Sequence, residues 1–137
     1  MNKKLEMKIV KKCPLLYRDY GGDPKKTCMA FGIAVGDGWY KIIHDLSIKL
    51  EWWIRTWKMK AKAAQVKEKF GLLRFYMKDG CAEMNDLIQE AEALSAKTCE
   101  ECGKPGKKTV NDMGWIQTLC PKCKGKAGKR LAKIMKA

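Results

Sequence analysis

Four cysteines in the last third of the chain restrict its fold more than any other feature. They form two C-x-x-C pairs, Cys99/Cys102 and Cys120/Cys123, which are separated by seventeen residues. Two thiolates at this spacing can bind one ion from a tight turn, and four of them close a tetrahedral structural zinc site. We therefore expect these cysteines to bind one Zn2+ ion. The alternative is a pair of disulfides or a redox C-x-x-C motif, for which the sequence gives no oxidising context.

The residues around the two pairs predict how this site folds. A segment rich in glycine and proline follows the first pair, and two strand-like runs, residues 108–110 and 115–119, then predict a hairpin. Residues 124–136 carry apolar side chains at helical spacing, so we expect a helix whose first turn carries the last two ligands. A knuckle, a hairpin and a helix in this order resemble a treble-clef zinc finger, with a plain zinc ribbon as the alternative.

Zinc at such a site serves as scaffolding rather than as a catalyst. A catalytic zinc keeps one position open for water, whereas sites with four cysteines are closed. The only histidine of the chain, His44, is distant in sequence, and we interpret it as a boundary residue of a helix. Because no nucleophile paired with a base and no pair of carboxylates stands out, we expect no catalytic residues and no enzymatic activity.

Charge is large and unevenly distributed. The chain has 29 Lys and Arg against 15 Asp and Glu, a net charge of +14, and residues 99–137 hold ten basic but only three acidic side chains. The resulting positive electrostatic field favours polyanionic partners, with nucleic acid as the first candidate and an acidic protein surface as the second. The alternative is that the lysines only solvate a small domain. The candidates for phosphate contact lie on the C-terminal helix: Lys126, Lys129, Arg130, Lys133 and Lys136.

The other cysteines and the absence of long apolar runs bear on location. Cys13, Cys28 and Cys81 have no matched spacing, which indicates a reducing compartment. Five lysines interrupt the first twelve residues, and no segment approaches the roughly 20 apolar residues of a membrane span. We expect a cytoplasmic protein without a secretory signal.

The chain divides into three parts by composition. We expect a basic N-terminal arm and loop at 1–26, an α+β body at 27–98 and the zinc-finger lobe at 99–137. In the arm, residues 3–12 predict a short basic helix that ends before Pro14, and residues 15–26 predict a loop. Residues 28–35 fit either a short buried strand or a packed loop.

The strongest helix prediction covers residues 39–57. Its apolar residues follow one stripe: Trp39, Ile42, Ile43, Leu46, Leu50, Trp53, Ile54 and Trp57. A glycine-flanked helix start can hold a phosphate on its free N–H groups, although a plain helix cap explains the same residues. The candidate ligand-binding residues at this start are Gly36, Asp37, Gly38 and Tyr40.

A hairpin and a second helix complete the predicted body. Residues 63–69 and 72–78 alternate as two strands. A second amphipathic helix follows residues 79–80 and runs to about residue 97, and its acidic residues are expected to point outward: Glu83, Asp86, Glu90 and Glu92. Arg74 and Tyr76, with nearby lysines, form a basic and aromatic strand face that could stack on a nucleotide or single strand. It could equally be a solvated face. We therefore predict an α+β fold, a helix-plus-hairpin body with a four-cysteine lobe.

Several stretches of the chain form a distinctive combination: residues 27–29, 36–40 (Gly-Asp-Gly-Trp-Tyr), 65–71, 73–76, 98–103, 114–116 and 118–120. Taken together, they resemble a family of small zinc-finger proteins encoded by tailed phages and prophages. This resemblance implies a phage origin and expression in the cytoplasm of a bacterial host cell, but it carries over no activity. Leu72 stands where related chains have a glycine.

Three functions fit these observations. The first, favoured by the resemblance, is a phage accessory protein that binds and inhibits or redirects a host component, such as an antiphage defence protein. The second is a nucleic-acid-binding regulator that uses the basic C-terminal helix, with an affinity that falls steeply with salt. The third is a binder of a small phosphorylated or nucleotide signalling ligand near residues 36–40 and Arg74/Tyr76.

Overall fold

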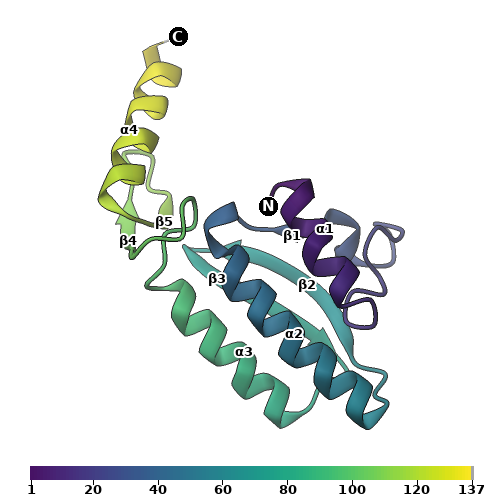
Figure 1. The fold of residues 1–137 in the computed structure, drawn as a ribbon. Helices are drawn as coiled ribbons and strands as arrows, with labels where there is room; N and C mark the ends of the chain where they lie inside the picture. Colours follow the sequence, from purple (N-terminus) through teal and green to yellow (C-terminus); the bar gives the residue numbers. More distant parts are fainter. Residues whose placement is uncertain (137) are drawn as a thin grey trace.

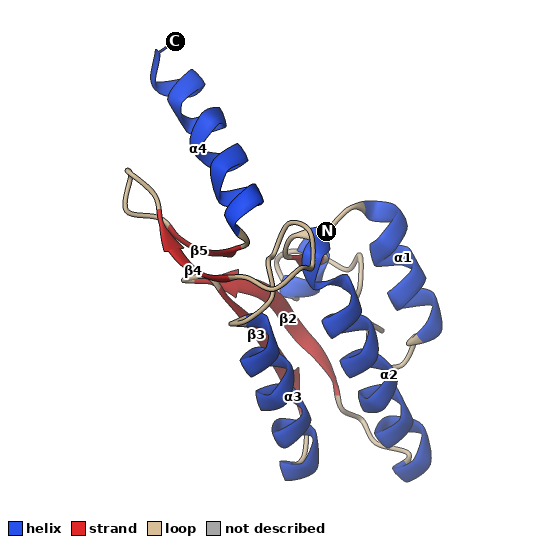
Figure 2. Cartoon of the chain, turned by 60° about the vertical axis from the view of Figure 1, so that its left-hand side comes forward, coloured by secondary structure: helices blue, strands red, loops and turns tan. Residues whose placement is uncertain are grey.

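Three helices cover one face of a three-stranded sheet, and a small lobe projects from one end of this body (Figures 1 and 2). The computed structural model describes residues 1–136. The α+β fold class predicted from the sequence is confirmed. The body contains α1 (Lys3–Lys12), β1 (Ile33–Ala34), α2 (Tyr40–Trp57), β2 (Lys62–Lys69), β3 (Leu72–Lys78) and α3 (Ala82–Ser95), with short 3-10 turns at Cys28–Phe31 and Asp37–Trp39. The lobe contains β4 (Lys107–Val110), β5 (Ile116–Leu119) and α4 (Pro121–Lys136).

The sheet has the order β1-β2-β3. Strands β2 and β3 form the predicted antiparallel hairpin, in which Val66 faces Phe75, and β1 adds a short parallel pairing of Ile33 with Val66. Residues 28–35, which the sequence left open, therefore form a 3-10 turn and a two-residue strand. Because side chains alternate along a strand, Val66 and Phe75 point toward the helices, and the opposite face carries no helix.

The helices contribute most of the core. Helix α2 buries Ile43, Leu46, Leu50 and Ile54, so its predicted apolar stripe is largely confirmed. Trp57 is instead exposed, because the buried face of α2 ends at Ile54 and the chain reverses just beyond the helix. None of the helices within residues 1–136 combines the length and the apolar character that crossing a membrane requires.

The N-terminal residues belong to the same core. Ile9, Leu16 and Tyr17 are buried in one cluster with the residues of α2, although the sequence set residues 1–26 apart as an arm and loop. Residues 15–26 are built of turns, and Leu16 receives the N–H of Ala63 on its carbonyl oxygen. The loop is therefore fixed to the first residues of β2.

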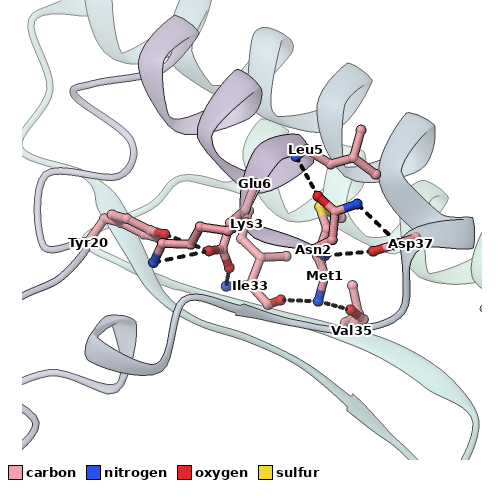
Figure 3. A network of polar contacts seen from close by, with 9 residues as sticks. All are labelled: Met1, Asn2, Lys3, Leu5, Glu6, Tyr20, Ile33, Val35 and Asp37. Carbon is pink, nitrogen blue, oxygen red and sulfur yellow. Dashed lines mark hydrogen bonds and ion pairs between the residues drawn. The ribbon is translucent and has the colours of Figure 1, made fainter.

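A polar network attaches α1 to the segment around β1 (Figure 3). Glu6 is buried and accepts hydrogen bonds from the Ile33 N–H and the Tyr20 hydroxyl, both at 2.5 Å. The amino group of Met1 donates to the carbonyl oxygens of Ile33, at 3.1 Å, and Val35. A buried carboxylate is stable only when such donors compensate its lost hydration, so Glu6 fixes α1 in one position.

The outer edge of β3 is closed by α3. The Leu73 N–H donates to Ser95 Oγ at 3.0 Å, and the Phe75 N–H donates to Glu92 Oε2 at 3.2 Å. The sequence prediction that Glu92 points outward is therefore wrong, because its carboxylate turns toward the strand. These contacts satisfy N–H groups that an open edge strand would offer to another chain.

Candidate metal centre

The four predicted ligands meet at one point in the lobe. The sulfur atoms of Cys99, Cys102, Cys120 and Cys123 all lie within 4.8 Å of one another, and Cys102 Sγ is 3.6 Å from Cys120 Sγ. Sulfurs that bind one zinc tetrahedrally at about 2.3 Å are roughly 3.8 Å apart. Three of the cysteines are buried, and Cys102 is exposed. The spacing of the sulfurs thus fits a single metal ion.

Local backbone structure brings each pair of sulfurs together. The first pair lies on a knuckle in which the Gly103 N–H donates to the Cys99 carbonyl at 3.0 Å, and Gly103 has a φ of 80°, which favours glycine. Cys120 immediately precedes α4, and Cys123 lies in its first turn. The knuckle, the β4–β5 hairpin and α4 therefore follow one another as in a treble-clef finger.

The second pair has two chemically different thiols. The Cys123 N–H donates to Cys120 Sγ at 3.4 Å and lowers the pKa of Cys120 to about 7. Burial raises the pKa of the Cys123 thiol to about 12. Metal binding requires thiolates, so a cation at the centre would supply the positive charge that buried sulfurs need to ionise.

The donor set defines what this site can do. It consists of four sulfurs without a histidine or carboxylate, and it can hold a metal ion. Four protein ligands leave no coordination position for water, which is the arrangement of a structural rather than a catalytic metal. The cluster therefore belongs to the framework of the lobe.

The lobe is joined to the body through Glu100. The Gly36 N–H donates to Glu100 Oε2 at 2.9 Å, and the Gly38 N–H donates to the Glu100 carbonyl at 2.7 Å. A Cβ atom on Gly38 would lie 2.2 Å from the Cys99 carbonyl oxygen, so only glycine allows this approach. The sequence suggested these N–H groups as phosphate donors, but both are already used in holding the knuckle.

Two further contacts complete the junction. The indole N–H of Trp39 donates to the Thr98 carbonyl at 2.9 Å, and the Thr118 hydroxyl donates to the Gly71 carbonyl at 2.6 Å. The first contact lies at the start of α2, and the second joins β5 to the β2–β3 turn. The body therefore holds both the knuckle and the hairpin of the lobe.

Helix α4 is attached to the lobe by its first ten residues, from Pro121 to Arg130. Cys123 is its only buried residue among those described, and Ile134 and Met135 are 72% and 65% exposed. Arg130 donates to both carboxylate oxygens of Glu101, at 2.8 and 3.1 Å, and thereby ties the helix to the knuckle. Of the predicted phosphate-binding residues, Arg130 is thus engaged within the protein, whereas Lys126, Lys129, Lys133 and Lys136 are exposed.

The remaining predicted ligand residues are not brought together. Gly38 and Tyr40, with Asp37, line a groove of about 520 Å3 between α2, α3 and the knuckle. Arg74 and Tyr76 lie on β3, on the sheet face that the helices leave uncovered. A small ligand could not contact both groups at once.

Sequence reasoning missed the residues that connect lobe and body. In the sequence, Glu100 only separates two predicted ligands. Gly36 and Gly38 could be explained either by a phosphate site or by a plain helix cap. A glycine pair at the start of a strong helix signals close backbone approach, but it does not reveal which segment approaches. His44, interpreted as a boundary residue, is half-buried, with its Nδ1 3.0 Å from Asp45 Oδ1.

Comparison of the chain with protein-family models, curated proteins and solved structures finds no match.

Proposed function

We propose that this protein is a zinc-stabilised nucleic-acid-binding protein without enzymatic activity, in which α4 makes the principal phosphate contacts. The observation that carries the proposal is the lysine stripe, defined as the exposed lysines along one side of α4. It consists of Lys122, Lys126, Lys129, Lys133 and Lys136. At 3.6 residues per turn, these five side chains fall within an arc of roughly 80°.

The lysine stripe is costly for an isolated helix. Successive members are three or four residues apart, and like charges at that spacing destabilise a helix by about 0.2–0.5 kcal/mol per pair. Residues 121–136 contain no acidic side chain that could compensate within the helix. A polyanion would remove this repulsion, because each phosphate would neutralise one of the lysines.

The position of α4 supports the same function. The helix extends away from the body beyond the hairpin (Figure 1), so its lysine stripe is accessible along its length. Its first turn carries Cys123 of the four-cysteine cluster, and Arg130, further along the helix, pairs with Glu101 of the knuckle. A helix fixed at one end and exposed along one basic face suits insertion beside a phosphate backbone.

Zinc is the metal that we propose for the site. Four thiolates in a tetrahedral arrangement select Zn2+ or an iron–sulfur centre. A colourless protein with one zinc per chain by elemental analysis would support this assignment. A brown protein containing iron and labile sulfide would contradict it.

Salt dependence of binding tests the nucleic-acid function. Labelled duplex DNA should bind with an affinity that falls steeply as salt rises, and Lys129→Gln with Lys133→Gln should reduce the slope of log affinity against log salt by about 1.8. The matched control is Lys8→Gln with Lys11→Gln, which removes two exposed charges from α1. Equal slopes for the wild type and the α4 variant would contradict a role of the stripe.

The second candidate is binding to a host protein, the function that the resemblance to phage proteins favours. The groove between α2 and α3 supports it, because Leu46, Leu87 and Leu94 line the groove, and an apolar hollow next to it carries Ile48 and exposed Trp52. Exposed apolar patches of this kind commonly mark protein interfaces. A host protein recovered with the tagged chain after nuclease treatment, and lost with Trp52→Ala, would support this candidate. Recovery abolished by nuclease would favour nucleic acid.

A further inference from the structure

The uncovered face of the sheet is basic and aromatic. We call it the open sheet face and define it by the side chains that alternate away from the helices. The paired rows are Gln65 with Tyr76, Lys67 with Arg74, and Lys69 with Leu72, followed by Lys78 at the end of β3. Tyr76 is 46% exposed. Acidic Glu68 alternates to the other side, and its carboxylate accepts the Gly71 N–H at 2.6 Å.

Folding alone does not account for the charges on this face. Lys67 and Arg74 are directly opposite each other, and like charges in facing positions of an antiparallel pair are destabilising. Lys62 and Lys78 also face each other, and only Lys62 has an ion-pair partner among the described residues, Asp19 at 2.8 Å. No carboxylate among the described residues forms an ion pair with Lys67 or Arg74, so a bound phosphate would relieve the repulsion between these two side chains.

The turn at the end of this face has a second unfavourable residue. Phe70 and Gly71 have φ values of 53° and 80°, a turn in which asparagine and glycine are the preferred pair. The left-handed conformation costs an ordinary side chain roughly 1–2 kcal/mol, and Phe70 is also 66% exposed. Lys69 Nζ lies 5.6 Å from the centre of its ring. Strained backbone positions cluster at binding sites, so Phe70, with its exposed ring, is a candidate binding residue.

From these features we infer that the open sheet face binds single-stranded nucleic acid. Bases stack on Tyr76 and Phe70, while Lys67, Lys69 and Arg74 neutralise the phosphates. Base-to-aromatic stacking on a basic surface is the usual way in which proteins hold single strands. From Leu72 to Tyr76 the strand β3 extends roughly 14 Å, which is comparable to the length over which sheet-borne aromatics stack about two or three bases.

A duplex offers no free base to Tyr76 or Phe70, because its bases are stacked inside. The turn at Phe70–Gly71 also contacts the lobe through the Thr118 hydroxyl, so the open sheet face ends where the lobe begins. A strand that leaves the sheet at this end therefore reaches the lobe that carries α4. The inference thus rests on the proposed function and adds a single-stranded segment, held by the sheet, to the phosphate contacts that α4 makes.

Fluorescence anisotropy with labelled oligothymidylate, oligouridylate and a duplex of equal length tests the inference. Tyr76→Leu should weaken binding of the single strands by a factor of roughly 5 to 150, corresponding to one lost stacked base. Tyr76→Phe should retain wild-type affinity, because it keeps the ring, and duplex binding should be unchanged in both variants. The two single strands show whether the face prefers DNA or RNA. Unchanged single-strand affinity in Tyr76→Leu would overturn the inference.

A charge variant provides an independent measurement. Lys67→Gln with Arg74→Gln should lower the salt slope of single-strand binding by about 1.4, whereas the control Lys8→Gln with Lys11→Gln should leave it near the wild-type value. If the variant with Lys67→Gln and Arg74→Gln had the same salt slope as the control with Lys8→Gln and Lys11→Gln, the inference would be contradicted. Thermal melting of each variant verifies that the fold is intact.

The variants also separate this inference from the proposed function. If Lys129→Gln with Lys133→Gln binds like the wild type while Tyr76→Leu weakens single-strand binding, the role of α4 is wrong and the open sheet face stands. If the α4 variant weakens binding but Tyr76→Leu does not, the proposed function stands and the inference fails. If the wild-type protein binds none of the oligonucleotides, both are wrong.

Discussion

The body and the four-cysteine lobe are stabilised in different ways. The body has a core of twenty buried apolar residues, whereas the corresponding cluster in the lobe has four members, of which three are the cysteines Cys99, Cys120 and Cys123. A segment as short as the lobe cannot bury enough apolar surface to offset its conformational entropy. A metal ion held by the four cysteines would take, in the lobe, the place that hydrophobic burial has in the body.

Removal of the metal should give the largest effect and should separate the two regions. Cys99→Ser, or chelation of the wild type, should unfold residues 99–136 and leave the body folded, because structural zinc contributes roughly 10–16 kcal/mol in zinc-finger peptides. Amide NMR spectra would show dispersion lost only for the lobe. The control is Cys28→Ser, which changes an exposed cysteine outside the site. A chelated protein with an unchanged melting curve would contradict this account.

A core substitution should produce the opposite pattern. Leu50 is fully buried in α2, so Leu50→Ala should lower the free energy of unfolding of the body by about 2–5 kcal/mol. Zinc affinity, measured by competition with a chelator at a temperature where the body is folded, should change little. Ile48→Ala, at a partly exposed position of the same helix, is the control. If Leu50→Ala weakened zinc binding as strongly as it destabilised the body, the two regions would not be separately stabilised.

The junction between the regions can be broken without touching either core. In Gly38→Ala the new methyl group would meet the Cys99 carbonyl oxygen, so the knuckle and the start of α2 must move apart. We expect a loss of about 1–3 kcal/mol, typical of overpacking, and two separate thermal transitions in place of one. Calorimetry measures both. A single unshifted transition would show that the close approach is unimportant.

The smallest effect should be a stabilisation confined to α4. A Cβ atom on Gly128 would meet nothing within 4 Å, and alanine is favoured over glycine in helices by about 0.5–1 kcal/mol. Gly128→Ala should therefore raise helicity in far-ultraviolet circular dichroism while the unfolding of the body stays unchanged. Gly38→Ala serves as the contrasting substitution, since the same methyl group is destabilising there. A loss of helicity in Gly128→Ala would contradict the exposed position of this residue.

Most elements could be predicted from the sequence because their signals are local. Helix α2 and the β2–β3 hairpin follow from periodicity, and the metal ligands follow from cysteine spacing, which fixes chemistry as well as geometry. Contacts between residues that are far apart in the sequence leave no such local pattern. Strand β1 has two residues and is a strand only because it pairs with β2. Leu16 packs in the core cluster, and its carbonyl oxygen accepts the N–H of Ala63, which is 47 positions further along the chain.

The errors also have a physical pattern. Trp57, Ile134 and Met135 continue the apolar stripes of their helices and are nevertheless exposed, because they lie beyond the points at which α2 and α4 contact other elements. Periodicity shows which side of a helix is apolar and not how far its partner extends. Glu92 was assigned to solvent by the same pattern, whereas its carboxylate completes the edge of β3.

The contact of Gly36 and Gly38 with the knuckle predicts which residues are conserved together. A descendant chain that lost Cys99 and Cys102 would also lose the rigid backbone that excludes a side chain at Gly36 and Gly38. Selection against larger residues at the two glycines would then relax. We therefore expect the glycine pair and the first cysteine pair to be retained or lost together among homologues, although a long helix and a hairpin separate them along the chain.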